Sequence, residues 1–220
     1  MRDRLRLIRL TVRHARLLVA VPAAIAWVIL PSILIVGQRT GTQRECVENL
    51  VCNMETLLPL CGLMWSFAYL RMWINHEGEE AMRVCRRRKT CAADLLILDF
   101  ILFLVILPLF MALYLTWELS WFTIIRAEAL RLAAQILLFS AVFYFISVLT
   151  WSVALGGMLV TAYHMFCILF ARYSEMRAFC LIRPDILAEE EGFPFLGVLA
   201  AALILYLAGA VIELFHSIMG

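Results

Sequence analysis

The stretch LAAQILLFSAVFYFISVLTWSVALGGMLVTAYHMFCILFA, from Leu132 to Ala171, decides how many times this chain crosses a membrane. It is apolar over roughly twice the length of a membrane-spanning helix, which needs about 20 residues. The stretch must therefore fold back on itself. Glycine pairs and short polar segments favour turns, so we expect the turn at Gly156-Gly157 or at Thr150-Trp151-Ser152. The stretch then supplies two spans.

Four further apolar runs are each long enough for one span. The first is too long for the apolar core of a signal peptide, which has about 7–15 residues, so we expect it to be retained. The sequence therefore predicts an all-α polytopic membrane protein with six transmembrane helices, forming one transmembrane domain over residues 1–220. The four runs extend from Leu17 to Gly37, Met54 to Ile74, Leu95 to Trp117 and Phe195 to Phe215.

The composition supports a membrane protein. Hydrophobic residues make up 64% of the chain and charged residues 16%, whereas soluble domains have about 45–50% and about 25%. We expect the lipid bilayer to be one partner. We expect no nucleic-acid partner, because the basic residues cluster only where helices would leave the membrane.

Two strongly basic segments fix the expected orientation. They are residues 1–16 and the loop of residues 75–91, and six spans place both on one side. The positive-inside rule assigns that side to the cytoplasm. We therefore expect a multi-pass protein of the cell membrane with both termini cytoplasmic and residues 172–193 extracytoplasmic. Residues 1–16 alternate Arg with Leu and Ile, which suits either an interfacial amphipathic helix or a plain topogenic anchor.

The loop of residues 75–91 opens with acidic residues and closes with basic ones. This order suits a short helix, because acids favour the N-terminal end of the helix dipole and bases its C-terminal end. Glu79 and Arg83 are also spaced for an i,i+4 ion pair. The alternative interpretation is a charged, solvated connector.

The order of Glu77, Gly78 and Glu80 before the basic cluster of residues 86–89 resembles the type 2 ABC transporter permeases. The resemblance implies six helices, cytoplasmic termini, an extracytoplasmic helical insertion between spans five and six, and a coupling helix that docks on a separate ATPase subunit. This chain departs from the family in lacking a Pro near the basic cluster and in having Asp94 where a Lys usually opens the third span. The residues that would couple to the ATPase are Glu77, Gly78, Glu79, Glu80, Arg83, Arg86, Arg87, Arg88 and Lys89.

The resemblance further implies an ABC ATPase subunit that binds ATP and Mg²⁺, and a second permease copy or a homologue. This chain itself is expected to bind no cofactor and to be no enzyme, because it lacks a phosphate-binding Gly-x-x-x-x-Gly-Lys-Ser/Thr motif. The leading expectation is the permease of an ATP-driven exporter. Two alternatives stay open: a substrate-capture subunit of a vitamin-uptake transporter, and a non-transporting membrane scaffold.

Polar residues inside the apolar runs are further candidates, since ionisable groups in a membrane are commonly functional. Asp99 and Glu213 lie toward the cytoplasmic ends of their runs, and Gln135 and His164 lie deeper. Each of the four side chains could either line a substrate path or bond to a neighbouring helix. No metal site is expected, because His76 and the acids after it do not have the spacing of a closed zinc site.

The chain has seven cysteines, so at least one thiol stays unpaired within a monomer. Cys46 and Cys52 face outward in the expected topology, where the compartment permits a disulfide between them. Cys85 and Cys91 are too widely spaced for a zinc or redox pair, and we expect them to be cytosolic thiols.

Overall fold

The computed structural model describes residues 16–74, 90–116, 122–173, 175–183 and 192–219. Its first span is interrupted by a π-helical turn, and consists of α2 (Arg16–Ala24), η1 (Ile25–Ile29) and α3 (Leu30–Thr40). The turn precedes Pro31, which has no backbone N–H to offer the carbonyl four residues earlier. The Leu30 N–H bonds to the Ile25 carbonyl instead, which widens the helix locally.

The second span is α4 (Gln43–Ile74), which begins well before the apolar run at Met54. A reciprocal cap starts it: the Thr42 N–H donates to Glu45 Oε2 at 2.9 Å, and the Glu45 N–H donates to Thr42 Oγ1 at 3.4 Å. Such a capping box satisfies two N–H groups that the first turn leaves open. The third span is α6 (Ala92–Thr116).

The apolar stretch that decides the number of spans forms two helices. These are α7 (Phe122–Thr150) and α8 (Val153–Phe170), joined by a turn at Trp151 and Ser152. Trp151 has a φ of 53°, and Ser152 caps α8 by accepting the Leu155 N–H at 3.3 Å. The turn is therefore at the polar segment and not at the glycine pair, which lies inside α8.

Gly156 serves helix packing. A Cβ at this position would lie 2.3 Å from Ser147 Oγ on α7. Glycine is thus required for the close approach of α8 to α7 after the turn.

The chain ends with the short 3-10 helix η4 (Arg177–Phe179) and with α10 (Phe195–Met219). Six of the described helical segments are long and apolar enough to cross a membrane, so the prediction of an all-α, six-span fold is confirmed. The chain has the architecture of a multi-pass membrane protein. Residues 1–15, which form the expected N-terminal segment up to Arg16, and residues 75–89, which include the expected coupling helix, lie outside the described residues.

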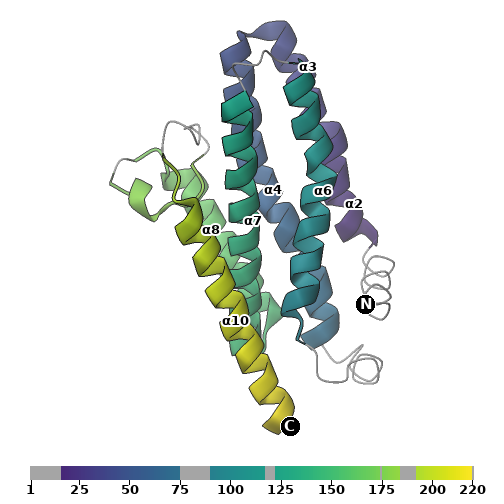
Figure 1. The fold of residues 1–220 in the computed structure, drawn as a ribbon, viewed down its shortest axis with the longest axis vertical. Coiled ribbons are helices and arrows are strands. Elements are labelled where there is room, and N and C mark those ends of the chain that lie inside the picture. Colours follow the sequence, from purple (N-terminus) through teal and green to yellow (C-terminus); the bar gives the residue numbers. More distant parts are fainter. Residues whose placement is uncertain (1–15, 75–89, 117–121, 174, 184–191, 220) are drawn as a thin grey trace.

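Helices α4 and α7 form the centre of the bundle. In their most apolar windows 61% of the residues are buried, against 22% to 39% in the other four spans. Figure 1 shows α2, α3 and α6 to one side of this central pair and α8 and α10 to the other. We call the end where α3 gives way to α4 the upper end, and the end where α7 turns into α8 the lower end.

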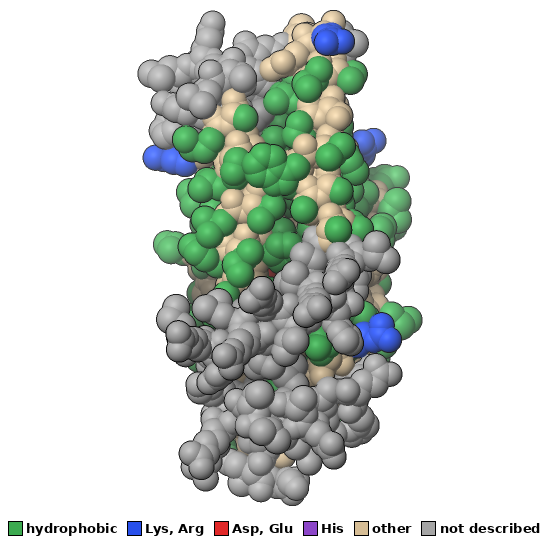
Figure 2. Space-filling view, turned by 90° about the vertical axis from the view of Figure 1, so that its right-hand side faces the viewer, with side chains coloured by type: hydrophobic (Ala, Val, Ile, Leu, Met, Phe, Trp, Pro, Cys, Tyr) green, Lys and Arg blue, Asp and Glu red, His purple; other side chains and the backbone are tan. Residues whose placement is uncertain are grey.

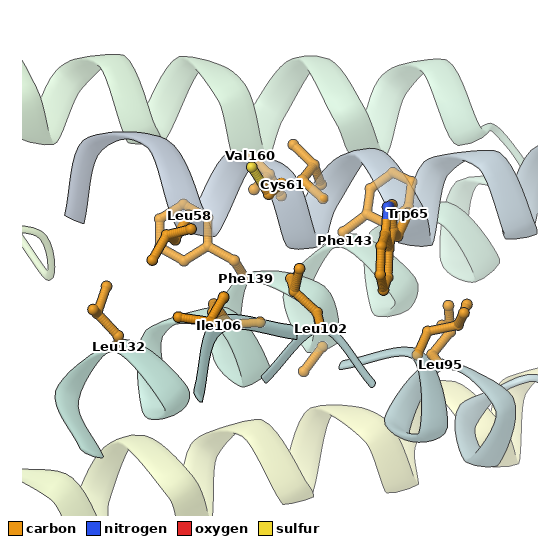
Figure 3. Packing of buried hydrophobic residues seen from close by; sticks show 14 of the residues in the cluster. Leu58, Cys61, Trp65, Leu95, Leu102, Ile106, Leu132, Phe139, Phe143 and Val160 are labelled. Atoms are coloured by element: carbon orange, nitrogen blue, oxygen red, sulfur yellow. The ribbon is translucent and has the colours of Figure 1, made fainter. Parts of the chain in front are cut away.

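The core between these helices is apolar and continuous. Figure 3 shows side chains of α4, α6, α7 and α8 converging on one another, including Leu58, Leu102, Phe139 and Val160. The outer surface is apolar as well: hydrophobic side chains cover most of the described face in Figure 2. Large side chains such as Met158 and Leu196, which are 72% and 85% exposed, suit contact with lipid.

Candidate functional site

Polar side chains are buried along the central helix α7, in two sets on different faces. Within each set the spacing is three or four residues, which keeps the side chains on one side of the helix. The upper set faces α4, and the lower set meets side chains of α4 and α10. The upper set is Glu128, Arg131 and Gln135, and the lower set is Ser140, Tyr144 and Ser147.

The upper set forms what we call the Arg131 cluster: Glu55, Glu128, Arg131 and Gln135. Arg131 holds Glu55 of α4 with two nitrogens, Nε to Oε1 at 2.6 Å and Nη2 to Oε2 at 3.2 Å. The Nη2 contact is a hydrogen bond and the Nε contact is an ion pair. Glu128 lies one turn away on α7, with its Oε1 4.0 Å from Arg131 Nη1. The side chains of Glu55 and Arg131 are fully buried.

Residues 181–183 and Phe193, which follow α8 in the chain, cover the Arg131 cluster. Arg131 Nη2 donates to the Arg183 carbonyl at 2.9 Å, and Gln135 Nε2 donates to the Leu181 carbonyl at 3.2 Å. Gln135 Nε2 also donates to Glu55 Oε1 at 2.8 Å. Phe193 lies against the guanidinium, with 5.6 Å from Arg131 Cζ to the ring centroid. Charge, hydrogen bonds and the ring contact together thus join α4 and α7 to Leu181, Arg183 and Phe193.

His164 of α8 is buried beside this cluster. Its Nε2 donates to the Thr56 carbonyl at 2.9 Å, one residue after Glu55, and its ring meets Phe139 edge-on. With Nε2 as the donor, Nδ1 is an acceptor. Among the residues that the structure describes, neither His164 Nδ1 nor Gln135 Oε1 has a hydrogen-bond partner. The region therefore offers two buried acceptors to a molecule that carries N–H or O–H groups.

The lower half contains what we call the tyrosine–carboxylate pairs. Tyr206 donates to Asp99 Oδ2 at 2.8 Å, and Tyr144 donates to Glu213 Oε2 at 2.6 Å. The two tyrosine rings lie 5.9 Å apart, which links the two pairs. A third pair is Tyr69 with Asp94 Oδ2, at 2.5 Å.

These pairs connect four helices through buried acids. Tyr69 is on α4, Asp94 and Asp99 are on α6, Tyr144 is on α7, and Tyr206 and Glu213 are on α10. Glu213 also accepts the Cys91 N–H at 2.9 Å, at the start of α6. A carboxylate is favourable there because the N-terminal end of a helix carries partial positive charge. Between the two halves, Ser66 of α4 and Ser140 of α7 share a hydrogen bond of 2.7 Å.

The four polar residues expected inside the membrane are all buried, and each bonds to another helix. They fall into two groups: Asp99 and Glu213 at the lower end, and Gln135 and His164 near the Arg131 cluster. The lower acids bond to tyrosines, Asp99 to Tyr206 and Glu213 to Tyr144.

The ion pair of Glu55 and Arg131 was not predicted. Glu55 is the second residue of one apolar run, and Arg131 directly precedes another, so the runs alone place Arg131 outside the spans. In the structure α7 begins at Phe122, well before the apolar run, and buries Arg131 completely. The spacing of Glu128 and Arg131, three residues apart next to an apolar run, was the available signal.

Two other sets of expected site residues have different outcomes. The coupling residues from Glu77 to Lys89 lie outside the described residues. Cys46 and Cys52 lie on the same helix six residues apart, about 9 Å along the axis. Bridged cysteines have Cα atoms about 4.4–6.8 Å apart, so the possible disulfide between Cys46 and Cys52 does not fit this helix.

Within the described part of the chain no three His, Cys, Asp or Glu side chains are grouped to hold a metal ion. The chain matches no protein-family model, and no curated protein or solved structure is significantly similar to it.

Proposed function

We propose that this chain is the membrane-spanning permease subunit of an ATP-driven ABC exporter, working with a separate ATPase subunit and a second permease copy or homologue. One observation carries the proposal: six spans bring the end of α4, the start of α6 and the outer ends of the first and last spans to the lower end of the bundle. Residues 75–89 therefore connect α4 and α6 at that end. The basic residues Arg83 and 86–89 make it the cytoplasmic side by the positive-inside rule.

Contacts around this connection are suited to transmit a force. Tyr69 on the last part of α4 bonds to Asp94 at the start of α6, and the Cys91 N–H bonds to Glu213 of α10. Glu213 in turn is held by Tyr144 of the central helix. An ATPase that pushed on residues 77–89 would thus move α4 and α6 together, and would act on α7 and α10 through buried hydrogen bonds.

The Arg131 cluster supports a transport role at the opposite end. It lies between the central helices and is covered by residues 181–183 and Phe193. It leaves Gln135 Oε1 and His164 Nδ1 as acceptors. A substrate with donor groups would find partners there once the covering segment moved. Charged and polar groups inside a membrane domain are costly, which favours a functional reason for keeping them.

Co-purification tests the proposal. An epitope-tagged chain, solubilised gently from its native membrane, is expected to bring down an ATP-binding cassette protein that mass spectrometry identifies. In reconstituted vesicles the chain is expected to stimulate that protein's ATPase activity. Reversing the charge of Arg86, Arg87, Arg88 and Lys89 to Glu should abolish both effects.

A matched variant reverses Arg172 and Arg177, two exposed residues of the segment after α8. It should keep both partner binding and stimulation, because it changes charge at the other end of the bundle. An ATPase that is stimulated equally by the charge-reversed loop would contradict the coupling role. A small ligand retained by the isolated chain would point to substrate capture, and the absence of any ATPase partner would point to a scaffold.

A further inference from the structure

Cys167 of α8 and Cys180, directly after η4, bring their thiols together at the upper end of α8. Both side chains are buried, with 0% and 1% of their surface exposed. The Cys167 thiol is a close neighbour of the Cys180 thiol. In the structure both are in the reduced form.

The backbone on both sides of Cys180 is held against α8 by Tyr163. The Tyr163 hydroxyl donates to the Phe179 carbonyl at 2.9 Å and accepts the Leu181 N–H at 3.2 Å. Cys167 lies four residues after Tyr163, on the same face of α8. Cys180 is therefore positioned over Cys167 by the two residues that flank it.

The Cys180 carbonyl is held as well, since it accepts the Arg183 Nε–H at 2.8 Å. Residues 179–183 thus form a short, well-bonded segment whose other carbonyls accept from Arg131 and Gln135. A covalent link at Cys180 would fasten this cover of the Arg131 cluster to α8.

We propose that Cys167 and Cys180 form a disulfide bond in the native protein, on the extracytoplasmic side of the membrane. The proposal rests on the orientation given under the proposed function, because that side of the membrane is oxidising. Each thiol gives up a proton and an electron as the sulfur–sulfur bond forms. The two electrons and two protons go to the disulfide of a thiol-oxidising protein, which is reduced to two thiols.

The Cys167–Cys180 disulfide forms during folding, before residues 179–183 pack against α8. Burial, and next the neighbouring Cys167 thiol, raise the pKa of Cys180. Exchange requires a thiolate, so the folded, reduced pair reacts slowly. The oxidised pair is shielded from reductants by the same burial.

The test counts thiols in membranes that contain the full chain. Free thiols are first blocked with N-ethylmaleimide under denaturing conditions, the chain is then reduced, and the newly released thiols are labelled with maleimide-polyethylene glycol. The wild-type chain should carry two labels after reduction and none without it. Cys167→Ser and Cys180→Ser should each carry none, whereas Cys61→Ser, which removes a buried cysteine of α4, should keep two.

A wild-type chain without labels after reduction would overturn the proposal, as would two labels that persist in Cys167→Ser. Peptide mass spectrometry of the non-reduced wild-type chain identifies the linked pair without any variant. The orientation is read separately by labelling Glu175→Cys, an exposed position, with a membrane-impermeant maleimide in intact cells. If the cysteine at position 175 is labelled but no disulfide is found, the disulfide proposal is wrong and the orientation stands. If the cysteine at position 175 is not labelled and no disulfide is found, the proposed orientation is wrong as well.

Discussion

Arg131 and Glu55 form a fully buried ion pair between the two central helices. Removing one partner leaves the other charge buried and uncompensated, which typically costs about 3–5 kcal/mol. We expect Arg131→Met and Glu55→Met to lower the thermal stability of the detergent-solubilised chain strongly. The double variant should be more stable than either single variant, because two apolar side chains leave no charge behind. Thermal unfolding followed by size-exclusion chromatography measures all three.

The exposed pair of Arg44 and Glu48 provides the control. The distance from Arg44 Nε to Glu48 Oε1 is 2.7 Å, close to that of the buried pair, but the two side chains are 65% and 45% exposed. Arg44→Met should change the stability by less than about 1 kcal/mol, since solvent screens such pairs. A buried pair that proved as dispensable as this one would show that Glu55 and Arg131 do not hold α4 to α7.

The hydroxyl of Tyr206 should matter more for stability than the charge of Asp99. Tyr206→Phe removes the donor that α10 provides to a buried carboxyl group, at a cost of about 1–3 kcal/mol. Asp99→Asn keeps an acceptor for the same hydroxyl and should cost less. The exposed Tyr173→Phe is the control and should be nearly neutral. Equal losses in the first two variants would argue against this hydrogen bond as the main role of Asp99.

The difference between Asp99 and Glu55 shows what the sequence can reveal about single residues. Asp99 interrupts a long apolar run, so its burial could be predicted. Glu55 and Arg131 stand next to the ends of runs, where a charged residue looks the same whether it is solvated or paired inside the bundle. Their burial depends on α4 and α7 continuing beyond the apolar runs, and the partner tyrosines of the lower acids depend on contacts between helices that no local pattern contains.

At the scale of elements, two glycines allow helices to approach α7 closely. A Cβ at Gly209 of α10 would lie 2.6 Å from the Tyr144 ring, and one at Gly156 would meet Ser147 Oγ at 2.3 Å. Gly209→Ala should also disturb the bond from Tyr144 to Glu213, one turn further along α10. We expect each alanine variant to cost about 1–3 kcal/mol, which is usual for overpacking.

Gly197, also on α10, is the control for these two variants, because a Cβ there would meet nothing within 4 Å. Gly197→Ala should leave the stability unchanged or raise it by about 0.5–1 kcal/mol, since alanine favours helix more than glycine does. Thermal unfolding of the three variants under the same conditions tests the comparison. A destabilised Gly197→Ala, with a neutral Gly209→Ala, would contradict the described packing of α10.

The turn between α7 and α8 illustrates what can be predicted about elements. The length of the apolar stretch was sufficient to require two helices, and one of the two expected turn positions is confirmed. The sequence could not choose between them, because a glycine pair serves equally well for a turn or for close helix packing. In the structure the turn lies at the polar segment, where Trp151 has a left-handed backbone conformation and Ser152 caps α8.

At the scale of the whole molecule, six spans place specific residues on opposite sides of the membrane. Arg44→Cys and Glu175→Cys, each made separately at an exposed position, should both react with a membrane-impermeant maleimide in intact cells. A cysteine at Thr150, at the end of α7, should react only after the membrane is opened. Labelling at Arg44 and Glu175 on different sides would mean an odd number of crossings between them. Labelling of the wild-type chain measures the background reaction of the native cysteines.

The π-helical turn in the first span has a consequence for the comparison of related sequences. A π turn accommodates one residue more than an α-helical turn does. Loss of one residue between Ile25 and Ile29 would convert this segment to regular α-helix and leave the faces of α2 and α3 toward α4 unchanged. A relative that is one residue shorter at this point would therefore keep the same bundle, and an alignment should permit a gap of one residue here before it shifts either half of the span.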